Sequence, residues 1–172
     1  SILLTGFEIP LDVVRYSLMM AKSTNLKTIL NPAPYFNINH EIYKLVDYLT
    51  PNEHEASALT NINIKTVDDA RVAGKKICEL GVGTSIITMG EKGVLCTRNS
   101  LDNEGLHLPS IKLKDRVIDT VGAGDVFNGA FATAISEAIN LEEALLFANK
   151  AASISVTKIG AALSSPYRDQ IK

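Results

Sequence analysis

The chain has 172 residues, of which 46% are hydrophobic and 21% are charged, and its formal net charge is −2 at pH 7. This length and composition predict one globular domain with a buried apolar core. The small net charge excludes the basic surface of a nucleic-acid-binding protein, and no apolar run reaches the roughly 18 residues of a membrane span. Two distant cysteines without metal spacing indicate reduced thiols and a cytoplasmic protein.

The first part of the chain alternates strand-like runs with helical periodicity. Residues 1–5 form an apolar run, and the apolar spacing after Pro10 predicts a helix that ends near Ser23. Because the first run looks like an interior strand with no leader before it, we expect an amino-terminal part to be missing. The next elements are expected in this order: a strand over residues 27–30, a short helix over 40–46, a strand at 48–49 and a helix that opens within 50–55.

A capping pattern marks the following helix. Thr66 and Asp69 stand three residues apart ahead of an apolar periodicity, and Gly81 supplies the stop. A β-branched run over residues 84–88, a glycine turn and a second run over 94–97 predict a hairpin. The remaining expectations are a surface loop over residues 99–105, strands over 107–113 and 116–119, a helix after residue 122, a helix over about 141–156 and a short helix after Pro166.

This order predicts an α/β fold: a mostly parallel sheet flanked by helices on both faces, with an antiparallel hairpin at one edge. Polar clusters at Asn31 and at residues 52–55, 88–93 and 119–125 each follow a predicted strand. Ligands of such sheets bind beyond the carboxyl ends of the strands, so these clusters are expected to gather on one rim.

Residues 119–125, with the sequence DTVGAGD, lie between a predicted strand and a predicted helix. The first amides of a helix have no intrahelical partner. These amides and the helix dipole both attract an anion, and phosphate is the expected ligand. Gly122 and Gly124 allow close approach of the backbone, and Asp125 is placed to act as a general base. A bare G-x-G-D would favour an ordinary capped turn, and neither a third glycine nor a P-loop is present.

Together with four other segments, this string resembles the ribokinase (PfkB) family of carbohydrate kinases along essentially the whole chain. The matching segments are residues 31–34 (NPAP), 50–55 (TPNEHE), 87–93, 119–125 and 147–160. The resemblance implies a ribokinase-like fold and ATP-dependent phosphorylation of a sugar hydroxyl with Mg²⁺, with D-ribose to D-ribose 5-phosphate as the expected reaction. Residues 1–172 would be the carboxyl-terminal portion of one such domain, without the amino-terminal sugar motif and lid.

The resemblance also assigns roles within the catalytic turn. Asp125 would be the base that also touches the sugar, and Gly122, Ala123 and Gly124 would form the anion hole for the transferred phosphoryl group. Asn52 would position the phosphates, and Glu55 would hold hydrated Mg²⁺ through water. The residues alone favour a simpler interpretation of Glu55, as a solvated acid in a first helical turn.

Further positions match the nucleotide, sugar and monovalent-cation sites of the family. Asn149 would contact the adenine, although a helical asparagine bonded to backbone explains this residue equally well, and Glu8 would bind the sugar. The nucleotide loop would comprise Thr88, Met89, Gly90, Glu91, Lys92 and Gly93. The K⁺ site would comprise Asp119, Val121, Ser155, Lys158, Gly160 and Ser164.

The predicted partners are therefore a small sugar and ATP, with no nucleic acid and no membrane. The complete protein is expected to form a homodimer, and this chain alone is expected to be inactive because most of the sugar pocket is missing. Two alternatives remain: another kinase of the family, acting on fructose, adenosine or another nucleoside, and a non-catalytic nucleotide-binding domain. A dehydrogenase-like dinucleotide domain is disfavoured by the missing third glycine.

Overall fold

The computed structural model describes residues 1–98, 105–111 and 116–171. The chain folds as two compact units. The first comprises Ser1–Met89 and Leu95–His107, and the second comprises Gly90–Val94 and Leu108–Lys172.

A six-stranded sheet has its strands in the same order as in the chain. The strands are β1 (Ile2–Gly6), β2 (Lys27–Asn31), β3 (Tyr48–Leu49), β4 (Thr84–Thr88), β5 (Val94–Arg98) and β6 (Leu106–Leu108). The first four are parallel, with Gly6 opposite Asn31 and Leu49 opposite Ser85, whereas β4 to β6 are antiparallel. The predicted sheet, parallel with an antiparallel edge, is confirmed.

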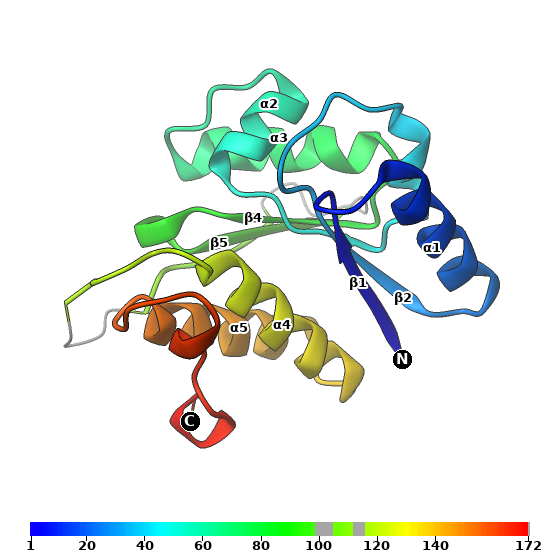
Figure 1. Ribbon diagram of the computed structural model, residues 1–172. Coiled ribbons are helices and arrows are strands. Elements are labelled where there is room, and N and C mark those ends of the chain that lie inside the picture. The colour runs from blue at the N-terminus through cyan, green and yellow to red at the C-terminus, as the bar shows by residue number, and fades with distance from the viewer. Residues whose placement is uncertain (99–104, 112–115, 172) are drawn as a thin grey trace. The chain divides into compact units, whose positions relative to one another are not determined.

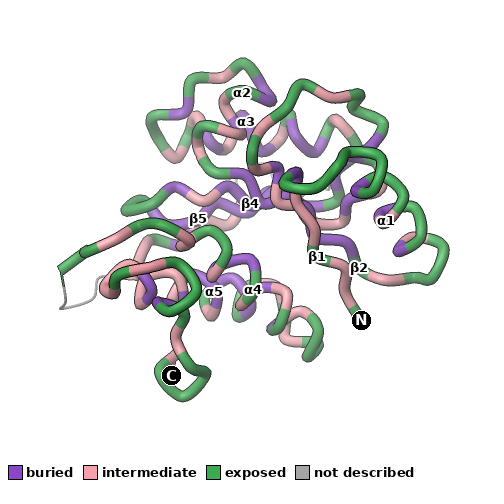
Figure 2. The backbone as a smooth tube through the Cα atoms, viewed as in Figure 1, coloured by how far each residue is buried: buried purple, intermediate pink, exposed green. Residues whose placement is uncertain are grey.

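The helices of the first unit are α1 (Leu11–Ser23), the 3₁₀ helix η1 (His40–Leu45), α2 (Glu53–Thr60) and α3 (Val67–Glu79). Figure 1 shows α2 and α3 side by side over the strands. Val14, Leu18 and Ala21 recur at four and three residues and form the buried stripe of α1. Strand β4 is buried along most of its length, as Figure 2 shows, because its β-branched side chains pack on both faces.

The second unit contains α4 (Ala123–Ser136), α5 (Leu141–Ser155) and three 3₁₀ helices, η2 (Gly90–Lys92), η3 (Ala162–Ser164) and η4 (Arg168–Ile171). Helices α4 and α5 pack lengthwise against each other (Figure 1). Phe131 of α4 and Leu145 of α5 are fully buried, and the rings of Phe127 and Phe131 stack with centroids 6.2 Å apart. The apolar faces predicted for both helices therefore form a core.

Some predicted elements differ from the structure. No strand forms over residues 116–119, because the amides of Ile118 and Asp119 donate to the carbonyl of Val156 instead of to a neighbouring strand. The strand predicted over 107–113 is limited to β6, and residues 112–115 lie outside the described part of the chain. Residues 99–104 of the predicted loop also lie outside it, and the short helices at 40–46 and after Pro166 are 3₁₀ helices.

Candidate active site

The turn before α4 depends on a glycine with left-handed backbone. Gly122 is the N-terminal cap of α4 and has a φ of 77°. A Cβ atom on Gly122 would lie 2.8 Å from the Cβ and 2.9 Å from the Cα of Ala161. Because other residues carry this atom and disfavour positive φ, only glycine fits without displacing the segment after α5. The predicted glycine turn that opens a helix is confirmed.

Backbone amides at this turn are available to an anion. The amide of Ala123 donates a 3.3 Å hydrogen bond to the carbonyl of Thr120 and is therefore engaged. The amides of Gly122 and Gly124 have no protein acceptor among the described residues. These two donors and the positive end of the helix dipole attract negative charge. The turn thus presents two of the three amides predicted for the anion hole.

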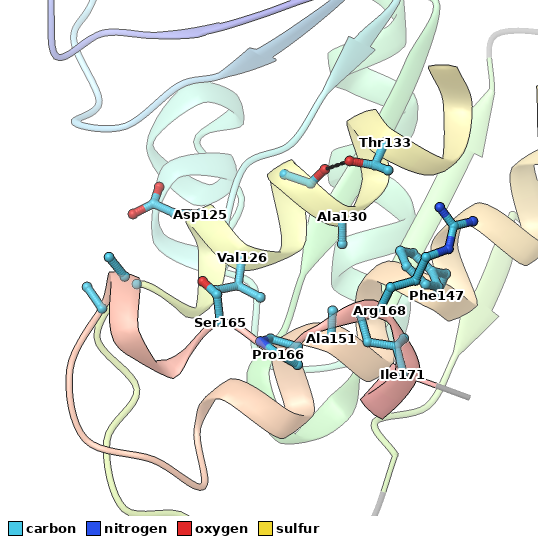
Figure 3. Close-up of a pocket in the computed structure, with 14 residues that line it drawn as sticks. Asp125, Val126, Ala130, Thr133, Phe147, Ala151, Ser165, Pro166, Arg168 and Ile171 are labelled. Carbon is cyan, nitrogen blue, oxygen red and sulfur yellow. Dashed lines mark hydrogen bonds between the residues drawn. The ribbon is translucent and has the colours of Figure 1, made fainter. Parts of the chain in front are cut away.

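Asp125 lies at the third position of α4, where an acid often bonds back to the capping residue. No side-chain hydrogen bond caps α4, and the exposed carboxylate of Asp125 has no hydrogen-bond or ion-pair partner in the described part of the chain. In Figure 3 this carboxylate points away from Val126 and Ser165. A carboxylate without a structural partner is available to accept a proton from a ligand.

Asp119 fastens the turn to the segment that follows α5. Its carboxylate accepts hydrogen bonds from the amides of Val121, at 3.0 Å, and Gly160, at 3.1 Å. These two bonds hold the pKa of Asp119 below its usual value. The carboxylate therefore stays charged and keeps residues 119–122 next to Gly160.

Three of the six residues predicted for a monovalent cation, Asp119, Val121 and Gly160, are thus brought together. Ser155 and Ser164 are buried, and their hydroxyls donate to the carbonyls of Ala152 and Ala161. The amide of Lys158 donates to the carbonyl of Ser155 at 3.1 Å. The carbonyl of Ala152 also accepts from the amide of Val156, whereas the carbonyls of Ser155 and Ala161 each retain a second lone pair for a further contact.

Asn52 and Glu55 form a closed capping box at the start of α2. The amide and the Nδ2 atom of Asn52 each donate to one oxygen of Glu55 at 2.9 Å, and the Asn52 Oδ1 atom accepts from the amide of Glu55 at 2.9 Å. Burial raises the pKa of Glu55 and outweighs these hydrogen bonds, so the pKa lies above its usual value. The hydrogen bonds of Glu55 are therefore those of an acid in a first helical turn, as the simpler interpretation expects.

Two of the four predicted polar clusters, at Asn31 and at residues 52–55, lie in the first unit, where the parallel strands β2, β3 and β4 end. The third cluster is divided: Thr88 and Met89 belong to the first unit, and residues 90–93 belong to the second. Asn31 ends β2, and Asn52, which follows β3, pairs with Thr88, the last residue of β4, in an isolated parallel bridge. Glu8 is exposed directly after β1. The fourth cluster, residues 119–125, belongs to the second unit.

Within the predicted nucleotide loop, the residues differ in exposure. Gly90, Glu91 and Lys92 are exposed and form η2. Met89 is 1% exposed and belongs to the apolar core of the first unit, so only its backbone is available to a ligand. Asn149 is also buried, and its Nδ2 atom donates to the carbonyl of Pro109 at 2.9 Å, which matches the backbone-bonded alternative for this residue.

Family comparison matches residues 10–168 to the pfkB family carbohydrate kinase model. This match covers most of the chain and includes the turn at Gly122, the capping box at Asn52 and the loop around Gly90. The chain belongs to the pfkB family of carbohydrate kinases.

Ribokinases are among the relatives of this pfkB-family chain. The ribokinase of Haemophilus influenzae is 38% identical over 170 residues, which are 98% of this chain and 53% of that protein. The crystal structure of a Thermotoga maritima ribokinase is 45% identical, with a TM-score of 0.85, and is matched over 99% of this chain and 55% of its own. An Arabidopsis thaliana ribokinase, solved with ribose and ATP, is 33% identical, with a TM-score of 0.92 over 99% of this chain and 54% of its own. The chain therefore has a ribokinase-like fold and spans about half the length of these relatives.

A cavity of about 630 Å³ in the second unit of this pfkB-family chain was not foreseen from the sequence. Figure 3 shows side chains from α4, α5 and the carboxyl-terminal segment around it, including Ala130, Phe147 and Pro166. Arg168 lines it, forms an ion pair with Glu137 and lies 5.9 Å from the centre of the Phe147 ring. Gly122 and Asp125 of the glycine turn also line it, whereas no sequence pattern connects them to the residues of α5 and of the carboxyl-terminal segment.

Two features are absent from the described part of the chain. No described helix combines the length and the hydropathy needed to cross a membrane. No cluster of three or more His, Cys, Asp or Glu side chains suited to a metal ion was found among the same residues.

Proposed function

We propose that the complete protein transfers the γ-phosphoryl group of ATP to a sugar hydroxyl, with D-ribose as the acceptor and D-ribose 5-phosphate as the product. The observation that carries this proposal is the unpartnered carboxylate of Asp125 beside the open amides of Gly122 and Gly124. The family and the ribose and ATP bound to the Arabidopsis relative support the same reaction.

In this proposal Asp125 takes the proton of the acceptor hydroxyl while the hydroxyl oxygen attacks the γ-phosphorus, and the bond to the bridging oxygen breaks to release ADP. The turn formed by Gly122, Ala123 and Gly124 acts as the anion hole. Its open amides stabilise the charge that the phosphoryl oxygens carry in the transition state. Asp119 supports this geometry by holding the turn against Gly160.

The remaining predicted residues bind the two substrates. Glu8 joins Asp125 on the sugar. Met89 takes part through its backbone alone, since its side chain is buried in the core. The nucleotide set is Asn52, Thr88, Met89, Gly90, Glu91, Lys92, Gly93, Gly124 and Asn149.

Two cations complete the proposal. Each oxygen of Glu55 accepts one hydrogen bond from Asn52 and keeps a further lone pair, so Glu55 can hold hydrated Mg²⁺ through water. Mg²⁺ would neutralise phosphate charge. The clustering of Asp119, Val121 and Gly160 fits a K⁺ site completed by Ser155, Lys158 and Ser164, and K⁺ would add a fixed positive charge near the turn.

We also propose that residues 1–172 are the carboxyl-terminal portion of one ribokinase-like domain, and that the complete protein is a cytoplasmic homodimer. The chain spans 53% of the length of the Haemophilus relative, which supports the further proposal that it is inactive by itself. Ribose-dependent release of ADP by the 172-residue chain alone would contradict that last statement.

The base is tested by Asp125→Asn in the complete protein, with Asp169→Asn as a matched control at an exposed position of η4. We expect kcat to fall roughly a thousandfold, because general-base catalysis contributes about 10²–10⁴. ATP affinity should change little, and Asp169→Asn should leave kcat unchanged. Unchanged turnover in Asp125→Asn would remove Asp125 from the mechanism.

A second experiment identifies the acceptor and the cation. Turnover of the complete protein is measured with ribose, fructose or adenosine as the acceptor, with and without K⁺.

A further inference from the structure

Residues 108–110 connect the glycine loop at residues 90–93 to helix α5, and all three segments belong to the second unit. Two hydrogen bonds and one close backbone approach make this connection. None of them is apparent from the sequence, since the partners are 17 to 40 residues apart.

The first link joins Ser110 to the glycine loop. The Ser110 hydroxyl donates a 2.6 Å hydrogen bond to the backbone carbonyl of Glu91. Two residues on, Gly93 has a φ of 90°, and a Cβ atom there would lie 2.6 Å from the amide nitrogen of Ser110. The amide of Gly93 closes the loop by donating to the carbonyl of Gly90 at 3.0 Å. The loop therefore lies directly against the backbone at Ser110.

The second link joins the same segment to α5. Asn149 is 7% exposed on α5, and its side-chain amide donates to the carbonyl of Pro109, the residue next to Ser110. A buried side chain on a packed helix has little freedom, so Asn149 fixes Pro109. Ser110 then transmits this fixed position to the carbonyl of Glu91.

We propose that Ser110 is a positioning residue that holds the backbone of residues 90–93 in the geometry that receives ATP. This inference rests on the proposed function, which assigns the loop to the nucleotide. Ser110 itself needs no contact with ATP. Loss of its hydroxyl would remove the hydrogen bond that ties the carbonyl of Glu91 to the segment at residues 108–110.

Hydrogen exchange tests the link without requiring activity. We compare the wild-type chain with Ser110→Ala, with Ser110→Thr, which keeps the hydroxyl, and with the control Ser136→Ala. The hydroxyl of Ser136 donates to the carbonyl of Thr133 within α4, so the control loses an equivalent bond away from the loop. In Ser110→Ala, the amides of residues 91–93 should exchange roughly two- to tenfold faster, as expected for the loss of one hydrogen bond. Wild-type rates should remain in Ser110→Thr and Ser136→Ala, and unchanged exchange in Ser110→Ala would overturn the inference.

Steady-state kinetics of the complete protein test the consequence for ATP. Ser110→Ala should raise the KM for ATP roughly two- to tenfold, with kcat and its pH profile unchanged, and Ser110→Thr should restore KM. Faster exchange with an unchanged KM would overturn the role of Ser110 in receiving ATP. If the wild-type protein itself fails to use ATP, the proposed function is rejected, and the exchange rates alone still decide whether Ser110 holds the loop.

Discussion

Helices α3 and α4 both carry an aspartate at the third position of the first turn, yet the two acids have different surroundings. At α3, Asp69 accepts from the amide and the hydroxyl of Thr66, and its own amide donates to the Thr66 hydroxyl. At α4, the capping residue is Gly122, which has no side chain, and the carboxylate of Asp125 has no partner among the described residues. The same helical position therefore holds an acid that stabilises the helix in α3 and an acid that remains available for chemistry in α4.

The largest expected effect comes from replacing that glycine. Gly122→Ala places a side chain at a φ of 77° and against the backbone of Ala161. We expect the free energy of unfolding to fall by about 1 to 3 kcal/mol, the usual cost of a strained left-handed residue. Thermal and urea denaturation measure this change.

Gly124→Ala is the matched control, because a Cβ atom at Gly124 meets nothing within 4 Å. This variant should be at least as stable as the wild type, since alanine favours a helix over glycine by about 1 kcal/mol. Equal losses in the two glycine variants would show that the contact with Ala161 does not constrain the turn.

A smaller effect on the free energy of unfolding is expected from removing the capping box of α3 or the free acid of α4. Thr66→Ala opens the box at α3 and should lower the free energy of unfolding by about 1 kcal/mol, the typical value of such a cap. Asp125→Ala should cause a smaller loss, because it removes only the attraction between the carboxylate and the helix dipole. Urea denaturation measures both losses. If Asp125→Ala lost as much unfolding free energy as Thr66→Ala, Asp125 would stabilise the fold, contrary to its lack of a structural partner.

The smallest effect concerns pH. The hydroxyl of Thr66, followed by the amides of Lys65 and Thr66, lowers the pKa of Asp69 in the folded chain. An acid with a depressed folded pKa adds stability above its unfolded pKa of about 3.9, and this stability is lost as the pH falls through the folded value. The urea midpoints of wild type and Asp69→Asn should therefore differ at neutral pH and converge towards about pH 2. A difference that persists in acid would indicate that the charge of Asp69 does not matter.

Local patterns were predictable where both partners lie within one helical turn. Thr66 and Asp69 were predicted as a capping box from their spacing, and the structure confirms it. Asn52 and Glu55 have the same spacing, and the structure shows a box there as well. A spacing of three residues suits both a cap and the pfkB-family motif, so the sequence left the contacts of Glu55 open.

Distant contacts explain what the sequence did not predict. Residues 116–118 have the composition of a strand, but the amide of Ile118 donates to Val156, 38 positions later in the chain. Met89 lies among polar loop residues in the sequence and yet packs in the core. The link from Ser110 to Glu91 and the cavity lined by Arg168 depend on segments that only folding brings together.

The sequence alone determined the order of strands and helices, the glycine turn and the family, because each is recorded in residues close together or in a distinctive string. Only the tertiary structure decided that Gly122 must accommodate Ala161, that Asp119 holds Gly160 and that Asp125 keeps its carboxylate free. The physical reason is that hydrogen bonds and steric contacts between distant segments depend on packing, which no local pattern records.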